Sequence, residues 1–181
     1  MRLLLSLVSA LFLLCSPAFA ASITYTVNES FPGLSAKGTI TTNGNLGTLT
    51  SADILDYSLT VSNGLFSSSF NQGGSFLPAQ VSGTNLTATA SALFFNYSDG
   101  AGSFGLGAPN DTFLCFDDSA GCEGAAAING IQVAISGILA NTTQSGTQQI
   151  AAVSAVPEPP SIILLGSGLL AFAGAARKRL A

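Results

Sequence analysis

The middle of the chain alternates between apolar and polar side chains with a period of two residues. Four segments show the pattern: "ITYTV" (23–27), "LDYSLTV" (55–61), "LTATASALFF" (86–95) and "IQVAI" (131–135). A half-buried strand alternates in this way, whereas an amphipathic helix repeats every 3.6 residues. The pattern predicts that these residues face a core: Ile23, Tyr25, Val27, Leu55, Tyr57, Leu59, Val61, Leu86, Ala88, Ala90, Ala92, Phe94, Ile131, Val133 and Ile135.

Turn signals lie between these segments, and pairs such as Asn-Gly suit the positive φ values of tight hairpins. Together with the alternation they predict an all-β ectodomain over residues 21–155. We expect about seven to nine short strands arranged as a β-sandwich or jelly roll. The expected turns are Asn43-Gly44, Asn63-Gly64, Gly73-Gly74, Asp99-Gly100, Asn129-Gly130 and Ser145-Gly146.

The N-terminus has the pattern of a secretory signal peptide over residues 1–20. Arg2 carries the positive charge, Leu3–Leu14 is apolar, and a small-x-small cleavage site follows with Ala18 and Ala20. The apolar stretch is too short to span a hydrocarbon core of about 30 Å. We expect export through the Sec translocon and cleavage by signal peptidase; the alternative is an uncleaved N-terminal anchor.

A second uncharged run, Ile162–Ala176, lies near the other end of the chain. A helix of this length reaches roughly 22 Å, and on its own it could equally be a buried core helix. The export signal and the basic residues Arg177, Lys178 and Arg179 favour a transmembrane helix at about 161–176. The basic residues would stop translocation and stay on the cytoplasmic side of the inner membrane.

The sequence Pro157-Glu158-Pro159-Pro160 precedes this run, and proline restricts it to an extended, unpaired conformation. Residues 156–181 resemble the PEP-CTERM sorting domain, because an extended tripeptide, an apolar helix and a basic end follow one another in that order. The resemblance implies that Pro157, Glu158 and Pro159 are recognised by exosortase, a membrane-embedded processing enzyme of Gram-negative bacteria. Its substrates are typically exported proteins linked to exopolysaccharide and biofilm matrix. The alternative is a plain tail anchor with an incidental proline linker.

A second, weaker likeness covers residues 38–61, which are similar to a recurrent ectodomain type of PEP-CTERM proteins. In that type a strand, an Asn/Asp-Gly turn and another strand lead into an Asp-aromatic-x-Leu-x-Val strand. The type carries no established activity, so this likeness supports only the all-β prediction.

Charge excludes one class of partner. Between residues 21 and 155 a single base, Lys37, stands against eight acids, so the formal charge is +1 − 8 = −7. Such a surface repels phosphate, and nucleic-acid binding is not expected. The eight acids are Glu29, Asp53, Asp56, Asp99, Asp111, Asp117, Asp118 and Glu123.

Cys115 and Cys122 remain after removal of the signal peptide and frame the turn-like sequence "FDDSAG". In an oxidising compartment we expect a disulfide between them, with two free thiols as the alternative. Their number is too small for a zinc site in a chain without histidine. Asp117 and Asp118 are weak candidates for calcium, since acidic turns are usually only solvated.

The absence of histidine removes the commonest general base, and we expect neither catalysis nor a cofactor. Two carboxylate pairs, Asp53/Asp56 and Asp117/Asp118, are the remaining possibility for a glycoside hydrolase. The leading hypothesis is a non-enzymatic protein, anchored transiently by its tail helix and then surface-bound or extracellular, in contact with exopolysaccharide. The alternative is a carbohydrate- or calcium-binding module on the same scaffold.

Overall fold

The computed structural model describes residues 21–73, 77–107, 112–122 and 127–153. Within these ranges it is almost entirely β, with thirteen strands in two antiparallel sheets and one short 3₁₀ helix. The prediction of an all-β domain is therefore confirmed. The predicted signal peptide (1–20) and tail segment (156–181) lie outside the described residues.

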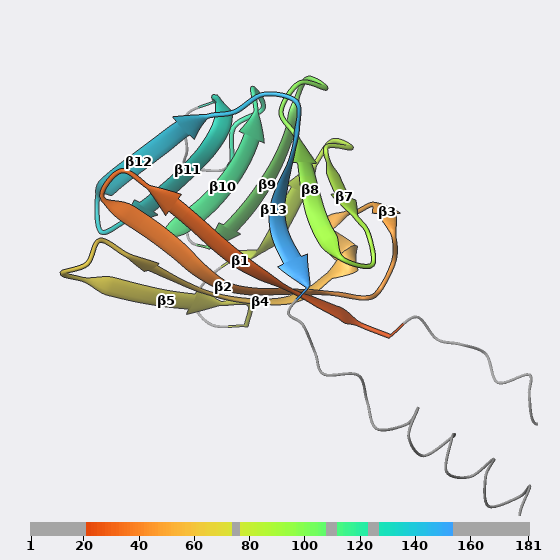
Figure 1. Cartoon of the computed structure of the whole chain (residues 1–181), viewed down its shortest axis with the longest axis horizontal. Helices are drawn as coiled ribbons and strands as arrows, with labels where there is room; N and C mark the ends of the chain where they lie inside the picture. The colour runs from red at the N-terminus through yellow and green to blue at the C-terminus, as the bar shows by residue number, and fades with distance from the viewer. Residues whose placement is uncertain (1–20, 74–76, 108–111, 123–126, 154–181) are drawn as a thin grey trace, which may run out of the picture.

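The larger sheet has eight strands in the order β3-β7-β8-β13-β1-β2-β4-β5 (Figure 1). Its long strands include the first and the last of the described chain, which pair side by side at its centre. The bounds are β1 Ile23–Phe31, β2 Leu34–Thr42, β3 Gly47–Thr48, β4 Ile54–Ser62, β5 Ser67–Asn71, β7 Leu86–Ala88, β8 Ala92–Asn96 and β13 Thr147–Val153, with the 3₁₀ helix η1 at Ser51–Asp53 before β4.

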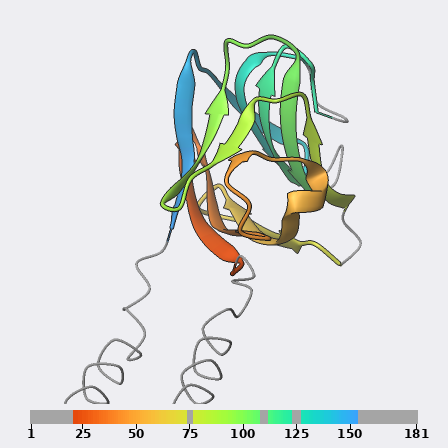
Figure 2. The same ribbon diagram turned by 90° about the vertical axis from the view of Figure 1, so that its right-hand side faces the viewer.

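The smaller sheet has five strands in the order β12-β11-β10-β9-β6. Its bounds are β6 Leu77–Ser82, β9 Gly102–Gly107, β10 Phe113–Asp118, β11 Asn129–Ile135 and β12 Ile138–Thr143. The two sheets form two layers, seen along their edges in Figure 2, which is a sandwich-like arrangement.

One hydrophobic core lies between the layers and takes side chains from both. Phe95 on β8 approaches Phe116 on β10 with ring centroids 6.2 Å apart, and Phe104 on β9 stacks on Phe116 at 5.8 Å. The Tyr57 hydroxyl accepts a hydrogen bond of 3.3 Å from the Gly107 amide and so joins β4 to β9. Burial of these aromatic rings, together with the aliphatic side chains of the same core, stabilises the packing of the two sheets.

In β4 the alternation predicts the buried face correctly except at its first position. Tyr57, Leu59 and Val61 are buried as expected, but Leu55 is half exposed and Ile54 takes the buried place. The cause is a β-bulge, because Thr41 pairs with Asp56 while Thr42 pairs with Ile54. The extra residue, Leu55, is turned outward.

The segment 86–95 is two strands, not the single strand that the alternation predicted. A turn at Thr89–Ser91 separates β7 from β8, and Thr89 closes it by donating its N–H to the Ala92 carbonyl oxygen at 2.9 Å. After the turn the phase changes, so Leu93 and Phe95 are buried and Phe94 is only partly so.

The predicted turn at Asn129-Gly130 is wrong, because both residues belong to β11 and pair with β10. Gly130 is needed there for close packing: a Cβ atom would lie 2.0 Å from the Thr142 carbonyl oxygen of β12. The turn lies further on, at Ser136-Gly137, where both residues have positive φ values of 46° and 82°. These values are those of a two-residue type I′ hairpin.

The count of about seven to nine strands was too low, since thirteen strands lie in the described ranges. The additional strands have little alternation to detect: β5 is "SSSFN", β9 is "GSFGLG" and β3 has two residues. Their backbone pairing, rather than the apolar content of their side chains, makes them strands.

Candidate functional site

The tail leaves the domain from the interior of a sheet. β13 lies between β1 and β8, and its last residue, Val153, is paired with Tyr25. The Val153 N–H donates to the Ser91 carbonyl oxygen at 2.8 Å, and the Tyr25 hydroxyl donates to the Thr89 carbonyl oxygen at 2.8 Å. The start of β1 and the end of β13 therefore lie at the same end of the domain, as Figure 1 shows.

The predicted processing residues lie just outside this frame. Pro157, Glu158 and Pro159, the basic residues Arg177, Lys178 and Arg179, and the signal-cleavage residues Ala18 and Ala20 are not among the described residues. Pro157 is only four positions beyond Val153 (157 − 153). A recognition motif at Pro157 is thus close in sequence to the folded body.

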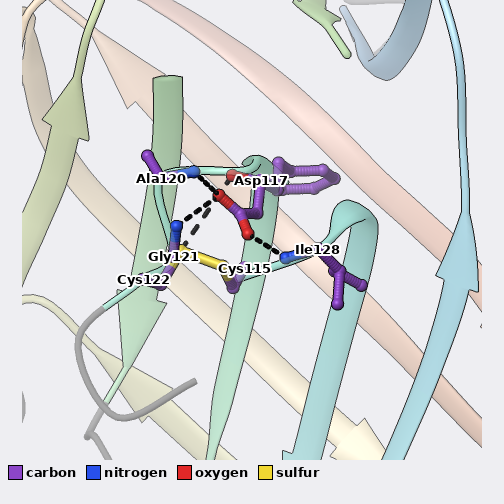
Figure 3. Close-up of a disulfide and its surroundings, with 7 residues drawn as sticks. Cys115, Asp117, Ala120, Gly121, Cys122 and Ile128 are labelled. Atoms are coloured by element: carbon purple, nitrogen blue, oxygen red, sulfur yellow. Dashed lines mark hydrogen bonds between the residues drawn. A yellow bond between two sulfur atoms is a disulfide. The ribbon is translucent and has the colours of Figure 1, made fainter. Parts of the chain in front are cut away.

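A disulfide joins Cys115 on β10 to Cys122 in the loop that follows (Figure 3). The two Cα atoms are 6.1 Å apart, within the range that disulfides normally span. Cys115 is buried on the outer face of the smaller sheet, where it forms a small cluster with Phe113, Ala134 and Cys122. The loop is thereby held against this outer face, away from the main core.

Asp117 fixes the same loop through its carboxylate (Figure 3). Its Oδ1 accepts hydrogen bonds from the amides of Ala120 at 3.0 Å and Gly121 at 2.7 Å. Its Oδ2 accepts one from the Ile128 amide at 2.7 Å. The side chain is fully buried, and these three N–H donors satisfy its charge.

Asp118 points to the opposite face of β10, because successive residues of a strand alternate. It is also buried, and its Oδ2 accepts hydrogen bonds from the Asn85 side chain at 3.1 Å and from the Gly100 amide. The two neighbouring aspartates are therefore not a pair facing one cleft. They are the last two residues of β10, and each anchors a loop. The sequence had instead predicted that they would be solvated residues of a turn.

The carboxylates of the other pair, Asp53 and Asp56, lie on different elements, η1 and β4. Asp53 ends η1, and its Oδ1 accepts hydrogen bonds from the side chains of Asn43 at 2.9 Å and Asn45 at 2.8 Å. Its Oδ2 accepts two more from the amide and hydroxyl of Thr50, both at 2.8 Å. These bonds, those from Thr50 first, hold the pKa of Asp53 well below its ordinary value. Asp56 lies exposed on β4.

The described residues also bear on two other kinds of site, one for a metal ion and one for a sugar. Across residues 21–73, 77–107, 112–122 and 127–153, no group of three or more His, Cys, Asp or Glu side chains could hold a metal ion. The three tyrosines, Tyr25, Tyr57 and Tyr97, are at most 1% exposed, so none is available for a sugar to stack on. A polar hollow of about 380 Å³ lies between η1, β6, β9 and the disulfide loop, lined by Ser51, Ser82 and Ser103 among others.

Comparison with known proteins identifies the tail. The sequence model of the PEP-CTERM protein-sorting motif matches residues 155–179. The chain carries a PEP-CTERM sorting motif. No curated protein and no solved structure matches the chain.

The PEP-CTERM match confirms the resemblance noted in the sequence and includes Pro157, Glu158, Pro159 and the basic residues up to Arg179. A PEP-CTERM motif implies an exported, surface-directed protein that exosortase sorts, so exosortase is the processing partner. The match begins at residue 155, two positions after the last described strand ends. The described residues include no helix long and apolar enough to cross a membrane. The predicted PEP-CTERM helix at 161–176 lies outside them.

Sequence reasoning found the PEP-CTERM tail but missed the anchoring roles of Asp117, Asp118 and Asn85. The PEP-CTERM tail is a contiguous pattern, whereas these roles depend on loops brought together by folding. One signal was available for Asp117, since an aspartate near the end of an apolar strand and three to four residues before Ala120-Gly121 can accept hydrogen bonds from turn amides.

Proposed function

We propose that the chain is an exported, non-enzymatic surface or extracellular-matrix protein. Its β domain is the cargo, and its tail is the address and temporary anchor. The observation that carries this proposal is the sorting motif at residues 155–179, directly after the strand that ends the described domain. The lack of histidine, and the positions of Asp117 and Asp118 on opposite faces of β10, support a role without catalysis.

The sequence of events follows from the order of the segments. The Sec translocon exports the chain, signal peptidase removes residues 1–20, and the helix at about 161–176 holds the protein in the inner membrane. Exosortase then takes the extended segment Pro157-Glu158-Pro159 into its cleft and cuts the chain near it. The product is released or attached at the surface, with exopolysaccharide as the matrix partner.

Cleavage near Pro157 would leave the domain intact, which supports this order of events. The nearest strand, β13, is held on both sides by β1 and β8, and its described pairs all lie at or before Val153, so a cut near Pro157 leaves these pairs in place. The Val153 amide is already bonded to Ser91.

The carbohydrate-binding alternative would have to use the polar hollow beside the disulfide loop, which contains no charged side chain in its lining. Buried tyrosines speak against a stacking platform built from them. The calcium alternative would have to displace the backbone amides that Asp117 already binds. Neither alternative is therefore preferred.

The test is to express the full chain in a host with an active exosortase and to measure the mass of the mature protein. We expect loss of the tail from the natural sequence, so that the protein ends near residue 157 and leaves the inner-membrane fraction. A variant with Pro157→Ala and Pro159→Ala should keep its tail and stay in that fraction.

The matched control is Pro160→Ala, which shortens the proline stretch but leaves the tripeptide intact, and we expect it to be processed. The proposal is contradicted if natural and tripeptide-variant chains end at the same residue. It is also contradicted if a host without exosortase yields the same shortened product.

A further inference from the structure

β12 is the open edge of the smaller sheet. It pairs with β11 through six consecutive residues without a register shift, and no described strand pairs with its other side (Figure 1). A straight, regular edge presents a row of backbone N–H and C=O groups to a new strand.

The turn at Ser136-Gly137 fixes which residues present these groups. In a two-residue hairpin the flanking pair, Ile135 and Ile138, exchanges both hydrogen bonds, and bonded pairs recur at every second residue. This alternation places Gln144 opposite Asn129 as a later bonded pair. The bond is present, since the Gln144 amide donates to the Asn129 carbonyl oxygen at 3.0 Å. The backbone groups of Leu139, Asn141 and Thr143 therefore point to the open edge.

Two of the other three edges are obstructed. β6 contains Pro78 and a register shift, and Ser51 occupies its edge by accepting from the Val81 amide at 2.8 Å. β3 has two residues. The third, β5, has five residues, and its exposed positions Ser67, Ser69 and Asn71 offer no apolar side chain. Proline, bulges and short length are usual protections of a sheet edge, and β12 has none of these three.

Charge, the remaining protection, is also missing from β12. No Asp, Glu, Lys or Arg occurs between Glu123 and Glu158, a stretch that includes β11, β12 and β13. Leu139 is 54% exposed and Ile138 48% exposed, so the strand also offers apolar area. An uncharged strand of this kind can lie beside a second copy of itself without like charges meeting.

We propose that β12 pairs antiparallel with β12 of a second copy of this chain. A twofold axis at Asn141 places Asn141 opposite Asn141 of the second copy and Leu139 opposite its Thr143. All outward-facing groups then pair with each other, and no like charges meet. The two smaller sheets join into one of ten strands (5 + 5). Because a twofold contact uses the β12 edge of both copies, the assembly closes as a dimer.

The direct test is a cross-link in the purified full chain in detergent micelles. Across such an axis the two Cα atoms of position 141 lie about 5.5 Å apart, within disulfide range. With Asn141→Cys we expect a covalent dimer after mild oxidation. The matched control is Ser69→Cys, an exposed position on the β5 edge, which should remain monomeric.

A pair of charge variants tests the register in the Asn141→Cys background. Leu139→Lys with Thr143→Lys sets two pairs of like charges opposite each other and should lower the cross-linked fraction about tenfold. Leu139→Lys with Thr143→Glu sets opposite charges there and should restore it. Both changes are at exposed positions, so each monomer should fold alike.

The proposal is overturned if Asn141→Cys stays monomeric, if it cross-links no more than Ser69→Cys, or if both charge variants behave alike. A cross-link to a different protein instead of a second copy overturns it as well. Dimers held by the tail alone would leave the cross-linked fraction insensitive to the charges on β12, which separates the two sources.

Discussion

Asp117 shows how a buried carboxylate can be held without a cation. Its three amide donors come from both ends of the loop after β10, so one side chain fixes residues that are up to eleven positions away. The disulfide at Cys122 ties the same loop to the strand. Removing the carboxylate would leave buried amides without acceptors, which costs more than an average hydrogen bond.

We expect Asp117→Ala to lower the free energy of unfolding by about 3 kcal/mol, because three amides lose a charged acceptor. Thermal unfolding of the purified protein, followed by circular dichroism, measures this. Asp99→Ala removes an exposed carboxylate on the β8–β9 connection and should change stability by less than about 0.5 kcal/mol. Equal effects of the two changes would show that Asp117 does not anchor the loop.

Asp53 gives a prediction for pH. Four hydrogen bonds from Thr50, Asn43 and Asn45 hold its pKa below the ordinary value of 3.8. A lowered folded pKa stabilises the fold above that value, and this stability is lost as the pH falls below it towards the lowered pKa.

Asp53→Asn should therefore cost about 1 kcal/mol at neutral pH, and the difference from the natural protein should shrink in acid. Denaturant unfolding at a series of pH values measures it. Asp56→Asn, an exposed position on β4, is the control and should show a small difference. A constant gap between Asp53→Asn and the natural protein down to strongly acidic pH would contradict the argument.

At the scale of elements, the disulfide joins Cys115 on β10 to Cys122 in the loop that follows and so closes a short loop of the chain. Replacing both cysteines, Cys115→Ala with Cys122→Ala, should lower the free energy of unfolding by about 2.5 kcal/mol, because the unfolded chain is no longer constrained. Denaturant unfolding of the oxidised protein gives the value. Reducing the natural protein should give a similar loss, and an unchanged midpoint in both cases would refute the prediction.

The long strands could be predicted from the sequence, but the residues at which they begin and end could be predicted less well. β1, β4 and β11 were found because alternation of apolar residues is a local property. Leu55, Ala90 and Gly130 were misplaced because a bulge, a turn and a close approach of strands depend on the neighbouring strand. Period-two reasoning cannot see a shift that pairing imposes.

The candidate site divides in the same way. Pro157, Glu158 and Pro159 were predicted because the motif is contiguous and proline acts locally. The contact between Asp118 and Asn85 joins residues 33 positions apart, so it could not be derived from spacing. Even the sheet order could not be derived, since β13 inserts between β8 and β1.

At the scale of the whole molecule, the points where the chain enters and leaves the domain lie at the opposite end from one exposed apolar turn, between β4 and β5. The β4–β5 turn carries Leu65 and Phe66, which are 86% and 69% exposed, and lies beside the β1–β2 turn. The chain enters β1 and leaves β13 at the other end, as Figures 1 and 2 show. A protein held by its tail would therefore direct Leu65 and Phe66 away from the point of attachment.

The central position of β13 sets a time order for an exported chain. β8 and β1 have no strand between them until residues 147–153 have been exported, so a partly exported chain leaves the facing edges of β8 and β1 unpaired. The sorting motif that exosortase recognises begins at residue 155, two positions after the end of β13. When the sorting motif of a chain has been exported, all thirteen described strands of its β domain have therefore been exported before it.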